Sequence, residues 1–179
     1  MKTLVRFSQS RIAWLSLTFS ALLLEIIALF FQYGMQLNPC VMCIYQRLAM
    51  IGLIVAGVIG SLAYRSRFMR FIAIILWGVS SIWGLKFAID LVDLQTNPSP
   101  FATCAFLPEF PSWMPLHEWI PSIFMPSGMC TDAPWIFGGF SMGQWMIGIF
   151  SAYCIALVIF IIPALRKNVN QPTRPMFKM

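Results

Sequence analysis

Four long apolar runs constrain this chain more than any other feature of its sequence. A helix needs about 20 mostly apolar residues to cross the hydrocarbon core of a bilayer, because every backbone polar group must be satisfied inside the segment. The four runs cover residues 12–31, 44–62, 71–89 and 145–162. Only 10% of the residues are charged, whereas soluble domains carry about a quarter. The sequence therefore predicts an all-α integral membrane protein, one domain folded as a bundle of four transmembrane helices.

The basic residues predict the orientation, because short cytoplasmic connections carry an excess of Lys and Arg. Such residues occur in 1–11, 63–70 and 163–179, whereas the connections 32–43 and 90–144 contain none. We therefore expect cytoplasmic termini and two outward connections. The formal net charge of +6 follows from this asymmetry, so no nucleic-acid partner is expected.

The ends of the first and last runs carry further signals. The first run follows basic residues, as in a signal peptide, but it is too long and no small-residue cleavage site follows, which predicts an uncleaved helix. Pro163 follows the last run and is expected to end that helix.

Four of the five cysteines lie on the outward side. Cys40 and Cys43 form a CxxC pair at the end of the first outward connection, and Cys104 and Cys130 lie in the second. In an oxidising compartment such cysteines form disulfides, and four cysteines allow three pairings, which the sequence leaves open. Cys154 lies among apolar residues in the last helix and is expected to behave as a small hydrophobe.

The position of Cys43 favours a reactive thiol. Cys43 comes immediately before the predicted helix 44–62, where free backbone N–H groups stabilise a thiolate. Arg47 lies one turn later and adds a positive charge. The alternative for Arg47 is that it reaches to the membrane interface. The alternatives for the cysteines are inert disulfides or a structural zinc site with four thiolates. A zinc site is disfavoured because the second CxxC is missing, and no metal is expected.

Two more charges lie inside the predicted helices at a similar depth. Glu25 and Lys86 both fall within the outer third of their helices, as Arg47 does. Charges inside a membrane are costly and often functional. One interpretation is a Glu25–Lys86 ion pair that only neutralises two buried charges. The other is a polar pocket beneath Cys43 that receives protons or binds a redox ligand.

The second outward connection is rich in proline and aromatic residues. Such a segment is suited to the lipid headgroup region. Residues 113–124 are predicted to form a short interfacial helix, although Pro115 and Pro121 oppose it. His117 is the only histidine and is expected to be an exposed polar residue rather than a catalytic one.

Three motifs in the outward connections resemble the bacterial disulfide bond formation protein B (DsbB) family. They are PCVMCIYQR at 39–47, PSPFATC at 98–104 and SGMC at 127–130. The resemblance runs from about residue 11 to residue 162. It implies an inner-membrane thiol:quinone oxidoreductase that reoxidises a periplasmic, thioredoxin-fold dithiol oxidase of the DsbA type. The electrons then pass to ubiquinone or menaquinone.

The resemblance also implies a role for each cysteine. The partner's thiolate attacks Cys104, which gives a mixed disulfide and frees Cys130. Cys130 then attacks Cys40 and leaves Cys43 as a thiolate against the quinone ring, with Arg47 favouring its negative charge.

Two further positions bear on the same pocket. Gln95 matches a position of the family's quinone pocket, while Leu91 stands where family members carry a histidine. The competing interpretations are a membrane redox enzyme of the vitamin K epoxide reductase type and a non-catalytic scaffold with structural disulfides.

Overall fold

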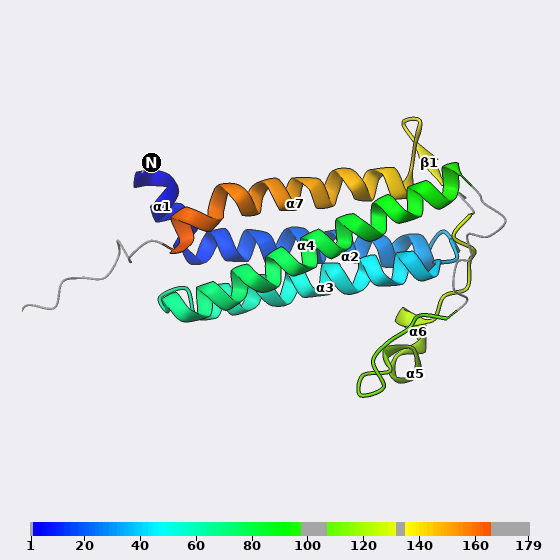
Figure 1. Cartoon of the computed structure of the whole chain (residues 1–179), viewed down its shortest axis with the longest axis horizontal. Helices are drawn as coiled ribbons and strands as arrows, with labels where there is room; N and C mark the ends of the chain where they lie inside the picture. The colour runs from blue at the N-terminus through cyan, green and yellow to red at the C-terminus, as the bar shows by residue number, and fades with distance from the viewer. Residues whose placement is uncertain (1, 98–106, 132–134, 166–179) are drawn as a thin grey trace, which may run out of the picture.

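A bundle of four long helices dominates the computed structural model, which describes residues 2–97, 107–131 and 135–165. Each of the four is long and apolar enough to cross a membrane, so the all-α membrane fold is confirmed. The four helices are α2 (Arg11–Tyr33), α3 (Val41–Leu62), α4 (Arg67–Thr96) and α7 (Met142–Leu165) (Figure 1). The shorter elements are α1 (Lys2–Ser8), α5 (Leu116–Trp119), α6 (Pro121–Phe124), β1 (Ile136–Phe137) and β2 (Phe140–Ser141).

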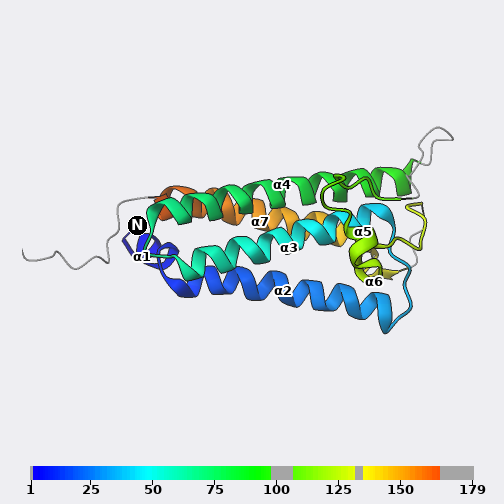
Figure 2. The ribbon, with the colours of Figure 1, turned by 90° about the horizontal axis from the view of Figure 1, so that it is seen from below.

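The long helices pack in chain order, with extensive interfaces between α2 and α3, α3 and α4, and α4 and α7. Between α2 and α7 the described residues form no comparable interface. Side chains bridge these two helices instead, as where the Tyr153 hydroxyl donates to Ser20 Oγ at 3.0 Å. We call the end of the bundle where α2 ends and α3 begins the loop end. Short helices α5 and α6 lie there beside α3 (Figure 2).

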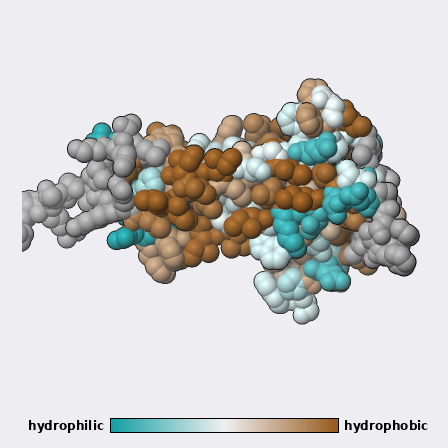
Figure 3. Space-filling view, turned by 45° about the horizontal axis from the view of Figure 1, so that its top comes forward, coloured by the Kyte–Doolittle hydropathy of each residue, from teal (hydrophilic) through white to brown (hydrophobic). Residues whose placement is uncertain are grey.

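Close contacts at small residues hold the helices together, as expected where lipid removes the hydrophobic driving force between them. Gly60 of α3 lies against the Trp14 ring of α2, and Gly84 of α4 lies against the Phe150 ring of α7. The outer surface carries exposed apolar side chains such as Val158, and Figure 3 shows hydrophobic residues covering the middle of the bundle on the face seen there. Hydrophilic residues gather toward the loop end in the same view.

Capping residues set two helix ends that hydropathy alone misplaces. Cys40 has extended backbone angles and caps α3, so Cys43 lies in the first helical turn rather than before the helix. Helix α4 continues past residue 89 to Thr96, because its polar last turns contain no Pro or Gly before the cap at Asn97. This extension carries Gln95 into the helix.

The expectation that Pro163 ends the last helix is wrong. Pro163 lies inside α7, which continues to Leu165. Proline removes its own hydrogen bond to the preceding turn and crowds the carbonyl there, but its φ is compatible with a helix and the residues after it keep their donors, so the helix can continue past it. The Pro163 carbonyl accepts a hydrogen bond from Gln9 Nε2 at 3.3 Å.

The second outward connection differs from the prediction in two places. In place of one interfacial helix over 113–124, two single turns, α5 and α6, meet at Ile120. The β1–β2 hairpin was not anticipated. Its turn contains Gly138 and Gly139 with φ values of 61° and 83°, which other residues rarely adopt.

Candidate functional site

A cavity of about 580 Å³ lies between α2 and α7 at the loop end. Most of its wall is apolar, with side chains such as Met50 and Met146 from different helices. Pockets of this size are typical of small-molecule sites. Five predicted site residues line the cavity: Glu25, Cys40, Cys43, Arg47 and Gln95.

The CxxC pair occupies the N-terminus of α3. Cys40 is buried, and its Sγ accepts a hydrogen bond from the Cys43 backbone N–H at 3.3 Å. Both cysteines are free thiols in the structure. The hydrogen bond to the Cys43 sulfur, together with burial, raises the pKa of the Cys40 thiol above its ordinary value. The N-terminus of α3, with its unpaired N–H groups, favours negative charge on a sulfur placed there.

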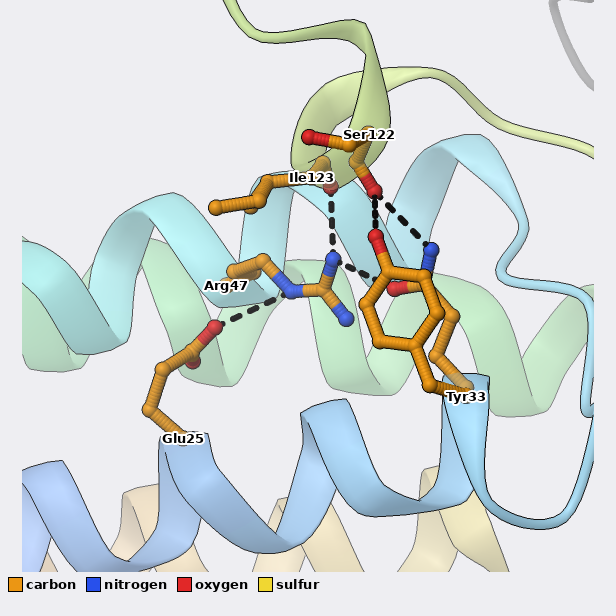
Figure 4. Close-up of polar contacts among 6 residues, drawn as sticks. Glu25, Tyr33, Arg47, Ser122 and Ile123 are labelled. Atoms are coloured by element: carbon orange, nitrogen blue, oxygen red, sulfur yellow. Dashed lines mark hydrogen bonds and ion pairs between the residues drawn. The ribbon is translucent and has the colours of Figure 1, made fainter.

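Arg47 is buried and fixed by three partners (Figure 4). Its Nε lies 3.0 Å from Glu25 Oε1, and its Nη1 donates to Gln32 Oε1 at 2.8 Å and to the Ile123 carbonyl at 2.6 Å. The other terminal nitrogen, Nη2, makes no hydrogen bond to any residue in the described part of the chain. The guanidinium is thus held in one orientation with a donor to spare for a ligand or a thiolate.

The interpretation of Glu25 and Lys86 as an ion pair is wrong, because Glu25 pairs with Arg47. Lys86 does not line the cavity; its Nζ lies 3.9 Å from Asp90 Oδ2, and its side chain is 62% exposed. Helical geometry gives the reason. Lys86 and Gln95 are separated by about two and a half turns of α4, so they face opposite sides of the helix. Gln95 takes the side of the cavity.

Gln95 and Leu91 bring α4 into the site. The Gln95 Oε1 accepts a hydrogen bond from Ser141 Oγ at 3.3 Å, next to the start of α7. Leu91, one turn earlier, is buried and also lines the cavity. An apolar side chain therefore occupies the wall where a histidine could have exchanged protons.

The remaining three cysteines do not line the cavity as the CxxC pair does, or lie outside the described residues. Cys130 is 1% exposed, is disulfide-bonded and packs in one buried cluster with Cys40 and Leu91. Cys104 lies outside the described residues. Cys154 is a free thiol of α7 that does not line the cavity. His117 stacks on Phe110 with ring centroids 5.7 Å apart, also away from the cavity.

Two residues at the end of α2, Gln32 and Tyr33, were not anticipated as part of the site. Gln32 Nε2 donates to the Ser122 carbonyl at 3.1 Å, and the Tyr33 hydroxyl donates to the same oxygen (Figure 4). The carbonyls of Ser122 and Ile123 belong to α6, where a short helix leaves them without internal partners. The last turn of α2 and Arg47 thus fasten α6 to the bundle.

Removing the Tyr33 hydroxyl is expected to loosen α6. A hydrogen bond of this kind contributes about 1 kcal/mol, so Tyr33→Phe should speed backbone hydrogen exchange around Phe124 about fivefold. Tyr45→Phe is the matched control, since the Tyr45 hydroxyl accepts from the Glu109 N–H at 2.7 Å and fastens a different part of the same connection. Unchanged exchange at Phe124 in Tyr33→Phe would contradict the fastening role.

Comparisons with known proteins give matches to a family model and to individual relatives. The family model "Disulfide bond formation protein DsbB" matches residues 10–160. Relatives named "Disulfide bond formation protein B" include one from Shewanella loihica, 61% identical over 92% of this chain and 96% of its own length. Another, from Shewanella amazonensis, is 56% identical over 94% and 99%. One from Psychromonas ingrahamii is 51% identical over 92% and 89%.

Proposed function

Because this chain belongs to the disulfide bond formation protein DsbB family, we propose that it oxidises the dithiol of a partner protein and passes the two electrons to a membrane quinone. Membership makes the chain a disulfide-forming oxidoreductase with several membrane spans. The observation that carries the proposal is the cavity, which brings the CxxC pair, Arg47 and Gln95 together between two membrane-spanning helices.

The residues around the cavity fit a quinone. Apolar walls from α2 and α7 suit a lipid-soluble ring, and Arg47 and Gln95 can donate hydrogen bonds to its oxygens. A bound quinone supplies a two-electron, two-proton acceptor. Lys86 has no place in this site, because it lies on the opposite face of α4.

The thiol chemistry can be written so that each step balances. The partner's thiolate attacks Cys104, which forms a mixed disulfide and releases Cys130 as a thiolate. Cys130 attacks Cys40 of a Cys40–Cys43 disulfide, so a Cys130–Cys40 bond forms and Cys43 leaves as a thiolate.

A second exchange completes the transfer. The partner's other thiolate attacks the mixed disulfide, which releases the oxidised partner and Cys104 as a thiolate. Cys104 then attacks Cys130 and restores the loop disulfide, so the electron pair rests on Cys40 and Cys43. A disulfide-bonded Cys130 beside free Cys40 and Cys43 is the combination that this stage requires.

The charged residues hold the reactive sulfur. Arg47 stabilises negative charge on Cys43, and Glu25 keeps the guanidinium oriented through the 3.0 Å contact to Nε. Gln95 orients the acceptor through its side-chain amide. Glu25 is therefore proposed as a positioning residue rather than as part of a merely structural ion pair.

The proposed location is the bacterial inner membrane, with both termini in the cytoplasm and the loop end in the periplasm. The distribution of Lys and Arg supports this orientation. The proposed partner is a periplasmic, thioredoxin-fold dithiol oxidase of the DsbA type, which would reach Cys104 from the aqueous side. The acceptor is ubiquinone or menaquinone.

Purified protein in lipid nanodiscs tests the function. With a reduced DsbA-type partner and a soluble ubiquinone or menaquinone analogue, we expect quinone-dependent oxidation of the partner. Cys104→Ser should lower this rate at least about a hundredfold, because the partner's point of entry is lost. Cys154→Ser, which removes a thiol away from the cavity, should stay within about twofold. Full activity in Cys104→Ser would refute its role, and a wild-type protein that oxidises nothing would refute the function.

A further inference from the structure

The segment that carries Cys130 is hydrogen-bonded to the residues just before Cys40. The backbone N–H groups of Ser127 and Gly128 both donate to the Pro39 carbonyl, at 3.0 and 3.1 Å. Ser127 Oγ also lies 3.2 Å from Asn38 Oδ1 and donates to it. Two connections that are 89 residues apart in sequence are therefore joined by three hydrogen bonds directly beside the CxxC pair.

Gly128 permits this contact because it has no side chain. A Cβ atom at this position would overlap the Asn38 backbone oxygen and would also crowd the Asn38 Cβ at 3.2 Å. Backbone atoms cannot move aside as the end of a flexible side chain can. Any larger residue at position 128 must therefore push the two segments apart.

The contact determines where Cys130 lies. Cys130 follows Gly128 by two residues, is buried, and packs with Cys40 and Leu91. The Pro39 carbonyl immediately precedes Cys40, which caps α3 and has its own conformation fixed by the helix. Both sulfur-bearing residues are thus attached to one rigid point, the N-terminus of α3.

We propose that Gly128 and the Pro39 carbonyl form a positioning device for thiol exchange between Cys130 and Cys40. This inference rests on the proposed function. In the exchange, the Cys130 thiolate attacks Cys40 Sγ, the Cys130–Cys40 bond forms, the Cys40–Cys43 bond breaks, and Cys43 leaves with the electron pair. No outside oxidant is needed. Holding the two sulfur atoms together makes the reaction intramolecular and oriented, and misplacement by about 1 Å can cost about a hundredfold in rate.

The test follows formation of the Cys130–Cys40 bond without quinone or partner. In full-length protein carrying Cys43→Ser and Cys104→Ser, oxidised glutathione is added and the internal disulfide is followed by mass spectrometry. Glutathione disulfide accepts the two electrons and leaves as reduced glutathione. Adding Gly128→Ala is expected to slow bond formation at least about tenfold. Gly148→Ala is the matched control, because a Cβ there meets no atom within 4 Å, and it should stay within about twofold.

A milder variant keeps the test valid if Gly128→Ala does not fold. Ser127→Ala removes only the hydroxyl that binds Asn38 and should slow bond formation about two- to fivefold. Equal rates in Gly128→Ala and Gly148→Ala, or an unchanged rate in Ser127→Ala when Gly128→Ala is unfolded, would overturn the proposal. This test contains neither quinone nor partner. If Gly128→Ala slows formation of the Cys130–Cys40 bond as expected but the wild-type protein fails the quinone assay, only the proposed function is refuted.

Discussion

Replacing Cys43 with serine is expected to lower quinone-dependent oxidation of the partner dithiol by at least about a thousandfold. A serine hydroxyl cannot form a disulfide with Cys40, and it does not ionise near neutral pH as a thiol beside a helix N-terminus can. Position 40 then carries a lone thiol, and no disulfide beside the cavity can accept the electrons that the loop cysteines take from the partner. The measurement is the loss of quinone absorbance under steady-state turnover with the reduced partner in excess.

The Cys43→Ser variant should also accumulate a linked form that the wild type does not. Cys40 remains packed beside Cys130, so its thiolate can attack Cys130 of the loop disulfide; a Cys40–Cys130 bond forms and Cys104 leaves as a thiolate. Peptide mapping without reductant identifies this linkage. Turnover in Cys43→Ser within tenfold of wild type would show that electrons leave the chain by another group.

Replacing Arg47 with methionine is expected to lower the same rate by about a hundredfold, the usual cost of losing one charge-stabilising donor from an active site. The exposed fraction of Arg47 is only 6%, so solvent cannot replace the lost charge. Arg47→Met also leaves Glu25, itself buried, as an unpaired carboxylate. Removing one partner of a buried ion pair typically destabilises a protein by about 3–5 kcal/mol.

A double variant separates the two effects. Arg47→Met with Glu25→Gln removes both charges, so most of the lost stability should return while the rate stays low. Thermal unfolding in nanodiscs measures the stability, and steady-state kinetics at varied quinone concentration measure the rate. If the double variant regains both stability and rate, the guanidinium serves only the ion pair and has no part in the chemistry.

The transmembrane helices could be predicted from sequence because the apolar run is a strong and local signal. Their ends could not, because local capping decides them. Cys40 begins α3 by accepting the Cys43 N–H, and Asn97 ends α4 beyond the last apolar residue of the run. A hydropathy window averages over these single positions.

The sequence could predict that the CxxC pair and Arg47 lie close together, because residue type and spacing carry that information. Arg47 and Gln95 line the cavity with the CxxC pair, although their roles stay predictions. The sequence places Glu25 and Lys86 at a similar depth, which allows an ion pair, but Glu25 contacts Arg47 while Lys86 lies beside Asp90, because depth does not determine which side of its helix a residue faces.

The residues that sequence reasoning missed share one property. Gln32, Tyr33 and Gly128 all donate hydrogen bonds to backbone oxygens of distant segments, at Ser122 or Pro39. Every residue has a backbone carbonyl, so such partners leave no mark in the amino-acid sequence. They become visible only when the connections are placed in space.

The bundle is an open ribbon of helices rather than a closed ring, since its three extensive interfaces leave the α2–α7 seam bridged by side chains. Widening that seam would leave the three extensive helix pairings intact. If a hydrophobic ligand enters the cavity, this seam is the side of the bundle where we expect it to arrive from the membrane interior, because no extensive helix pairing has to separate there.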